Sequence, residues 1–149
     1  MSDPIPPPTA RRPEEVLELV SLALSDGDLE AALAQYERGA LLRPWVGKAA
    51  SDGNSVGDIL LCLMELRLPL SAGVRAVLPT CGLALVLGER HMAGAGPDGQ
   101  PIQLSGTGST IVRQQPDGAW RIVADAWCLD GPGLPPGATD SESATTQRS

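Results

Sequence analysis

The chain has 149 residues, enough for one domain with a substantial core, and its net charge is −7. Its only lysine is Lys48 and its arginines are scattered, which argues against nucleic acid or an anionic membrane as a partner, because phosphate groups are bound by clustered Lys and Arg. No apolar stretch approaches the roughly 20 residues of a membrane-spanning helix.

Residues 1–12 are rich in proline and are predicted to form a disordered arm. Pro13, Glu14 and Glu15 then predict the start of a helix, because proline suits the first helical position and acidic side chains suit the positive end of the helix dipole. Asp26 and Gly27 end this helix. The folded domain is therefore expected to begin at residue 13.

A second helix is predicted after Asp28, which suits the capping position. Leu29, Leu33 and Tyr36 line one face of it, and Gly39 ends it. The segment "ALLRPWV" that follows is a short strand broken by its proline. A loop rich in turn-forming residues leads to a third helix, predicted over residues 58–68 and ended by proline.

The pattern then changes to that of strands, in four segments: "GVRAVLPT", "GLALVLGERHMA", "PIQLSGTGSTIVRQQ" and "AWRIVADAWCL". Three helices followed by long antiparallel strands predict an α+β domain. Glycine permits bulges, so the sheet is expected to curl around the helices and enclose a cone-shaped hydrophobic cavity. The glycines of "LSGTGST" lie inside a strand pattern, so they indicate sheet curvature or close packing and not a phosphate-binding loop. Residues 131–149 are predicted to be a disordered tail.

The cysteine and histidine content limits the chemistry. Cys62, Cys81 and Cys128 are odd in number and show no paired spacing, so they are interpreted as free thiols of a reducing cytoplasm. The N-terminal segment has no apolar run typical of a secretory signal. His91 is the only histidine, which excludes a histidine-rich metal site, and neither a metal nor a cofactor is expected.

Several of these motifs occur together in one known superfamily. The order of "DGDLEAALAQYE", "QYERGALL" and "STIVRQQPDGAWRIVADAW" resembles the nuclear transport factor 2-like, or SnoaL-like, superfamily over residues 13–130, and more narrowly its SgcJ/EcaC group, some members of which belong to enediyne and other polyketide biosynthesis. The resemblance implies a cystatin-like α+β barrel. It does not give a function, because the superfamily contains isomerases, cyclases, epoxide hydrolases and non-catalytic binding proteins.

The steroid isomerases of this superfamily use a carboxylate base, a tyrosine and a protonated acid. Aligning this chain on the shared motifs puts the tyrosine's place at Val20, the base's place near Pro44 and the acid's place near Thr110. None of these residues performs the required task, and no Asp or Glu lies between Glu37 and Asp52. The steroid-isomerase mechanism is therefore rejected.

Asp125, between two tryptophans in "WRIVADAW", is the main candidate for acid–base chemistry. Strand alternation puts Trp120 and Ile122 on one apolar face, with Asp125 and Trp127 on the other. On that interpretation Asp125 points outward and pairs with an arginine. The resemblance implies the alternative, an acidic residue on the last strand that faces the cavity, and a bulge near the middle of the strand allows it. Burial then raises the pKa of the carboxyl toward neutrality.

The other candidates are weaker. His91 titrates near neutral pH and is a possible acid–base partner of Asp125, although its place near a turn is also typical of a surface residue. The apolar wall of a ligand site has four candidate residues: Tyr36, Trp45, Met64 and Trp127. Tyr36 equally suits the core.

Three hypotheses follow. The first is an enzyme of polyketide-type secondary metabolism, a cyclase, isomerase or hydrolase acting on a hydrophobic polyene or polycyclic intermediate. The second is a non-catalytic protein that binds or carries such an intermediate. The third is an assembly domain with a filled cavity. A homodimer formed through the outer face of the sheet is expected on the resemblance, and because an apolar sheet face needs covering.

Overall fold

The computed structural model describes residues 6–43, 53–96 and 98–131, with the backbone alone for residues 53–55. The elements are α1 (Glu15–Asp26), α2 (Leu29–Leu33), β1 (Tyr36–Arg43), α3 (Gly53–Glu65), β2 (Leu70–Thr80), β3 (Leu83–Ala95), β4 (Pro101–Gln114) and β5 (Trp120–Trp127). None of the helices in the described part of the chain is long and apolar enough to cross a membrane.

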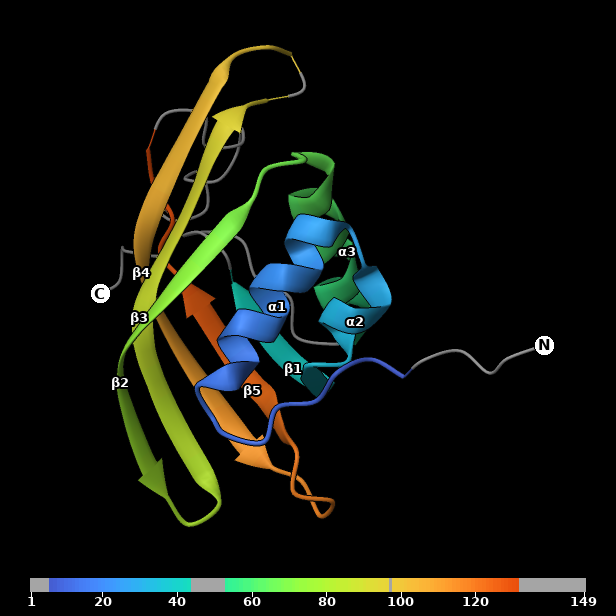
Figure 1. The fold of residues 1–149 in the computed structure, drawn as a ribbon, viewed down its shortest axis with the longest axis vertical. Coiled ribbons are helices and arrows are strands. Elements are labelled where there is room, and N and C mark those ends of the chain that lie inside the picture. Colours follow the sequence, from blue (N-terminus) through green and yellow to red (C-terminus); the bar gives the residue numbers. More distant parts are fainter. Residues whose placement is uncertain (1–5, 44–52, 97, 132–149) are drawn as a thin grey trace, which may run out of the picture.

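The strands form one curved sheet in the order β1-β5-β4-β3-β2. β2, β3, β4 and β5 pair antiparallel along the chain, whereas β1 pairs parallel with β5. The three helices lie on one face of the sheet, and the hairpin of β3 and β4 extends beyond them (Figure 1). The predicted α+β class is confirmed, and the predicted strands agree with the observed ones to within a few residues.

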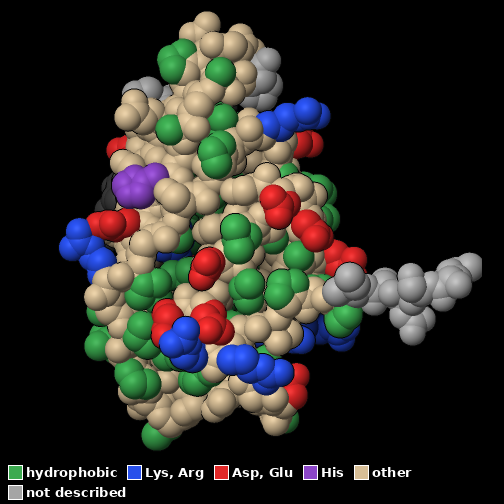
Figure 2. Space-filling view, in the orientation of Figure 1, with side chains coloured by type: hydrophobic (Ala, Val, Ile, Leu, Met, Phe, Trp, Pro, Cys, Tyr) green, Lys and Arg blue, Asp and Glu red, His purple; other side chains and the backbone are tan. Residues whose placement is uncertain are grey.

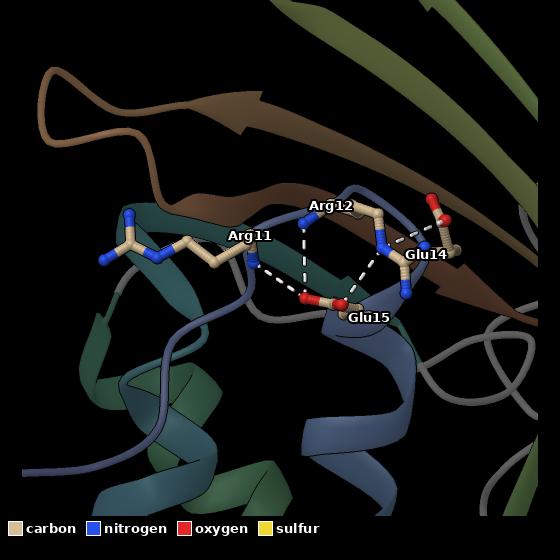
Figure 3. Close-up of polar contacts among 4 residues, drawn as sticks. All are labelled: Arg11, Arg12, Glu14 and Glu15. Atoms are coloured by element: carbon tan, nitrogen blue, oxygen red, sulfur yellow. Dashed lines mark hydrogen bonds and ion pairs between the residues drawn. The ribbon is translucent and has the colours of Figure 1, made fainter.

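The start of α1 is held by the carboxylate of Glu15 (Figure 3). This carboxylate accepts hydrogen bonds from the backbone N–H groups of Arg11 (2.8 Å) and Arg12 (3.3 Å), and from Nε of Arg12 (3.1 Å). These bonds satisfy donors just ahead of the helix. At the other end Gly27 adopts the left-handed conformation (φ 71°) that glycine favours, so the predicted end of the first helix is confirmed.

The second helix is shorter than predicted. Asp28 caps it as expected, by accepting a hydrogen bond from the backbone N–H of Ala31 (3.1 Å). The helix ends at Leu33, and Tyr36 begins β1 opposite Ile122, so the placement of Tyr36 on a helical face is wrong. Pairing with β5 outweighs the helical pattern, because a helix of so few residues gains little from its own hydrogen bonds.

The N-terminal arm is also shorter than predicted. The backbone carbonyl of Pro8 accepts a hydrogen bond from the side chain of Gln35 (2.8 Å), and the fully buried Ala10 forms a β-bridge with Trp120. Arg11 donates to the backbone oxygen of Asp117 (3.0 Å). Residues 8–11 are therefore part of the domain and not a disordered arm. The predicted disorder of residues 1–5 and 132–149 lies outside the described residues.

The core lies between the helices and the inner face of the sheet. The helices contribute mostly apolar side chains, including Val16 and Val20 from α1 and Leu60 and Leu63 from α3. Among the described side chains few buried ones are polar: Ser21, Gln35, Arg90, Thr110 and Asp125. On the face of the molecule in Figure 2, the arginine side chains (blue) are few and lie near acidic ones (red).

Candidate functional site

A bulge in β5 turns Asp125 toward the core. Ala124 pairs with Ile111 of β4 and Ile122 pairs with Val112, so Val123 has no partner across the strand pair. Ile122 and Asp125 consequently both face the helices, and Asp125 is only 1% exposed. The predicted bulge is confirmed, and the interpretation of Asp125 as an outward-pointing residue is wrong.

Three side chains from three other strands surround the Asp125 carboxylate. Thr110 of β4 donates its hydroxyl hydrogen to Oδ1 (2.8 Å), and Tyr36 of β1 donates to Oδ2 (3.2 Å). Arg90 of β3 forms an ion pair with Oδ1, with Nη2 at 3.7 Å. Neighbouring strands thus each place one polar side chain at the same level of the inner face.

Arg90 is 1% exposed and reaches Asp125 chiefly through Thr110. Its Nη2 donates to Thr110 Oγ1 (3.0 Å), and its Nη1 donates to the backbone oxygen of Glu89 (3.3 Å). The guanidinium lies 5.5 Å from the centre of the Trp127 ring, a cation–π distance. Gly108 makes room for it, because a Cβ atom there would lie 2.7 Å from Nη1. The buried cation is therefore held on several sides.

The surroundings change the proton affinity of both acidic groups. Burial raises the pKa of Asp125 above its ordinary value of 3.8, and this outweighs the opposing effects of the Arg90 charge and of the hydrogen bonds from Thr110 and Tyr36. Burial also raises the pKa of Tyr36 well above its ordinary value, and the nearby Asp125 charge adds to the rise. Asp125 therefore exchanges a proton closer to neutral pH than an exposed aspartate, whereas Tyr36 keeps its proton.

Trp127 completes the cluster and is 1% exposed. Its indole N–H lies close enough to Asp125 to favour the charged carboxylate and so lower its pKa. By distance and angle, however, Trp127 Nε1 makes no hydrogen bond with any described residue. We define the polar cluster as Tyr36, Arg90, Thr110, Asp125 and Trp127. It combines a carboxylate able to move a proton with a fixed positive charge, which are the elements of acid–base and electrostatic catalysis.

The structure brings together some of the predicted site residues and separates others. Asp125, Tyr36 and Trp127 meet in the polar cluster. His91 does not, because it follows Arg90 in β3 and alternation turns it to the outer face, where it is exposed (purple in Figure 2). The predicted pairing of His91 with Asp125 is therefore wrong. Trp45 lies outside the described residues.

Met64 lies apart from the cluster, on α3. It is half-buried and lines an open groove of about 690 Å³ at the end of that helix, together with Gly27, Arg67 and Gly96. A second groove of about 560 Å³ runs between α1 and β2. Asp125 lines neither groove, so these pockets do not give the polar cluster a ligand cavity.

Among the described residues no group of three or more His, Cys, Asp and Glu side chains is arranged to hold a metal ion.

Arg90 and Thr110 were not among the predicted site residues, although the sequence held a signal for one of them. Alternation along "GERHMA" puts Arg90 on the face opposite Glu89 and His91, which is the core face. An arginine on a core face needs a buried partner. Nothing in the sequence links that arginine to Thr110, whose partners come from strands paired at a distance.

Comparison with known proteins establishes the fold. No protein-family model and no curated protein matches the chain by sequence. A ketosteroid isomerase-like protein from Erwinia carotovora atroseptica SCRI1043 superposes with a TM-score of 0.70, at 16% identity over 80% of this chain and 94% of that chain. An NTF-2 like protein of unknown function from Shewanella oneidensis MR-1 has a TM-score of 0.64 at 17% identity, covering 77% of this chain and 94% of that one.

A protein of unknown function with a cystatin-like fold, from Nostoc punctiforme PCC 73102, has a TM-score of 0.64 at 16% identity and covers 82% of this chain and 90% of its own. At such identities the likeness establishes the fold alone. The chain thus has the cystatin-like, nuclear transport factor 2-like fold that the motifs predicted. The narrower resemblance to the SgcJ/EcaC group stays a prediction.

Proposed function

We propose that the chain binds a hydrophobic small molecule of polyketide-type secondary metabolism on the inner face of its sheet, and that Asp125 moves a proton on it. The observation that carries this proposal is the buried carboxylate of Asp125, hydrogen-bonded to Thr110 and Tyr36 beside the buried guanidinium of Arg90. A buried charged group lowers stability unless it is fully compensated, so its presence in a mostly apolar core supports a functional role.

The reaction class that fits is an isomerisation, cyclisation or hydrolysis that begins with proton transfer. Asp125 would act as the acid or base, since burial raises its pKa. Tyr36 and Arg90 would stabilise negative charge on a substrate oxygen, because low-dielectric surroundings strengthen such contacts. The steroid-isomerase mechanism is not part of the proposal: Val20 and Thr110 occupy the places of its tyrosine and acid, and Pro44 lies outside the described residues.

A non-catalytic binding or carrier protein is the second candidate. One observation favours it: both oxygens of Asp125 already accept hydrogen bonds, from Thr110 and Tyr36, and Arg90 balances the charge. A carboxylate with its partners in place also serves to fix the strands in one arrangement. On this alternative the chain shields a reactive intermediate and leaves it unchanged.

Native mass spectrometry separates the two candidates. The purified chain is incubated with hydrophobic metabolites extracted from its producing strain, and the bound and released compounds are weighed and chromatographed. A compound released in isomerised, cyclised or hydrated form supports the enzyme, provided that Asp125→Asn releases it unchanged. A compound that binds and always returns unchanged supports the carrier. If no compound binds, both candidates fail and the assembly domain stands.

A homodimer formed through the outer face of the sheet is part of the proposal. Leu78 of β2 is 50% exposed, Ile111 of β4 is 40% exposed and Leu41 of β1 is 39% exposed, which leaves apolar surface in need of cover. Sedimentation showing only monomer at micromolar concentration would refute the dimer.

The three cysteines are exposed free thiols, which supports a reducing compartment such as the cytoplasm.

A further inference from the structure

We infer that two copies of this chain pack the outer faces of their sheets together about a two-fold axis that runs across the strands, with Arg121 of each copy against Asp130 of the partner subunit. The inference rests on the homodimer of the proposed function. It goes further, because it assigns the orientation of the two copies and the charged contacts that fix it.

The strand register divides the outer face of the sheet into rows of side chains that cross neighbouring strands. The helices lie on the opposite face, so no described helix covers these rows (Figure 1). One row is apolar and consists of Leu78, Leu85, Ile111, Ala124 and Leu41. The next row has mostly small side chains and consists of Ala76, Leu87, Ser109, Ala126 and Arg43. We call these two rows the apolar band.

The apolar band has a basic side and an acidic side. On the basic side Arg113 of β4 lies directly opposite Arg121 of β5. On the acidic side Asp130 forms a β-bridge with Ser105 of β4, and Glu89 of β3 lies between that row and the band. Residues paired across strands share a face, and Ser105 is exposed on the outer one, so Asp130 lies there too. Charge therefore changes sign along the strand direction.

Arg121 and Asp130 have no ion pair with any described residue, whereas the other charges beside them do: Arg113 with Glu37 and Glu89 with Arg75. The Nε atom of Arg121 is buried without a hydrogen-bond partner among the described residues. Arg121 also lies opposite the like charge of Arg113, which is unfavourable. A carboxylate from a second copy relieves this imbalance.

Symmetry fixes where the second copy lies. Ser109 is midway along β4 between the row of Arg121 and the row of Asp130. A two-fold axis across the strands at Ser109 exchanges these two rows, so Arg121 meets Asp130 of the partner subunit at two equivalent contacts. An axis along the strands would instead bring basic side to basic side and acidic side to acidic side, which lowers affinity.

The same rotation lays larger side chains over smaller ones. Ile111 lies one row from the axis on one side and Thr107 one row from it on the other, so Ile111 packs over Thr107 of the partner subunit. The same holds on β2 for Leu78 and Gly73, and such pairs suit close packing of two sheets. Arg43 ends the axis row at the edge strand β1, where the twist of packed sheets draws their corners apart.

The test reverses the charges of Arg121 and Asp130. Arg121→Glu and Asp130→Arg should each raise the dissociation constant of the dimer about ten-fold or more, because each change turns attraction into repulsion at both equivalent contacts. The double variant Arg121→Glu/Asp130→Arg meets its own copy with opposite charges, so its constant should return to within about three-fold of the wild-type value. Sedimentation equilibrium measures these constants.

Mixing the variants decides the orientation. Wild type mixed with the isotope-labelled double variant should form homodimers and few heterodimers, because like charges meet at both contacts of a heterodimer. An axis along the strands predicts the reverse, a preference for the heterodimer. Arg121→Glu mixed with Asp130→Arg should form mainly heterodimers, since opposite charges meet only there. Native mass spectrometry measures the proportions.

Control variants carry the same charge changes away from the sheet. Arg67→Glu and Glu65→Arg alter exposed residues at the end of α3 and should leave the dissociation constant unchanged. Ile111→Asn alters an exposed apolar side chain of the band and should raise the constant at least about ten-fold. Circular dichroism melts establish that each variant is folded.

The outcomes separate the inference from the homodimer. Wild type that stays monomeric at micromolar concentration would overturn both, but not the proton transfer proposed for Asp125, which the metabolite assay tests. A dimer that Ile111→Asn dissociates, but that is unaffected by the charge reversals or prefers the heterodimer with the double variant, would overturn the inference alone. A dimer that none of these changes weakens is formed through another face, which refutes the inference and the predicted interface.

Discussion

Removing the charges of Arg90 and Asp125 singly and together should reveal that the two residues stabilise the fold as a pair. At the observed separation of 3.7 Å, and with an effective dielectric constant of about 20, their attraction is about 4 kcal/mol. Arg90→Met leaves the carboxylate buried without its cation, and Asp125→Asn leaves the guanidinium without its anion. Each single change is expected to lower the free energy of unfolding by about 3–5 kcal/mol.

The double variant should lose far less than the sum of the two single variants, because it removes both buried charges. We expect an interaction energy of about 2 kcal/mol or more between the two sites. Urea unfolding followed by circular dichroism gives the four free energies, provided that the slope against urea is unchanged among the variants. If the single effects add to within about 0.5 kcal/mol, Arg90 and Asp125 do not interact as a buried ion pair, and the reasoning fails.

Three further predictions concern the same cluster. Burial raises the pKa of Asp125 above 3.8, so over a range of pH the folded chain keeps a proton that the unfolded chain has lost. The free energy of unfolding of the wild type should therefore fall relative to that of Asp125→Asn as pH rises from about 4 through the folded pKa. A difference between the two free energies that does not change with pH would contradict this. Thr110→Val should cost about 1–3 kcal/mol by removing the hydroxyl between Arg90 and Asp125, whereas Thr110→Ser should keep most of the stability in the same urea assay. Gly108→Ala should cost about 1–3 kcal/mol by displacing the Arg90 guanidinium, and a loss of equal size in the Arg90→Met background would refute that cause.

The sequence contains most of the information about the fold, because the fold follows from local signals. Gly27 ends α1 where a left-handed residue is needed, and Asp28 caps α2 through its side chain. Alternation and turn residues likewise predict the strands after Leu70. The errors at Tyr36 and at residues 8–11 have one cause: both segments pair with β5, which is far away in the sequence, and no local pattern reports such a partner.

The candidate site was less predictable than the fold because one extra residue in β5 decides it. Strict alternation would put Asp125 on the face opposite Ile122, and only the bulge at Val123 brings the two side chains to the same face. Bulges are set by the pairing with the neighbouring strand, so the sequence of β5 alone left both orientations open. Once Asp125 faces inward, the rest of the cluster follows from register: Thr110 lies directly opposite Asp125 on β4, and Gly108, opposite Trp127, leaves the space that the Arg90 guanidinium fills. Gly108, which the sequence pattern assigned to sheet curvature, therefore also makes room for a buried cation beside the carboxylate. For this reason Gly108→Ala and Arg90→Met should affect the same contact.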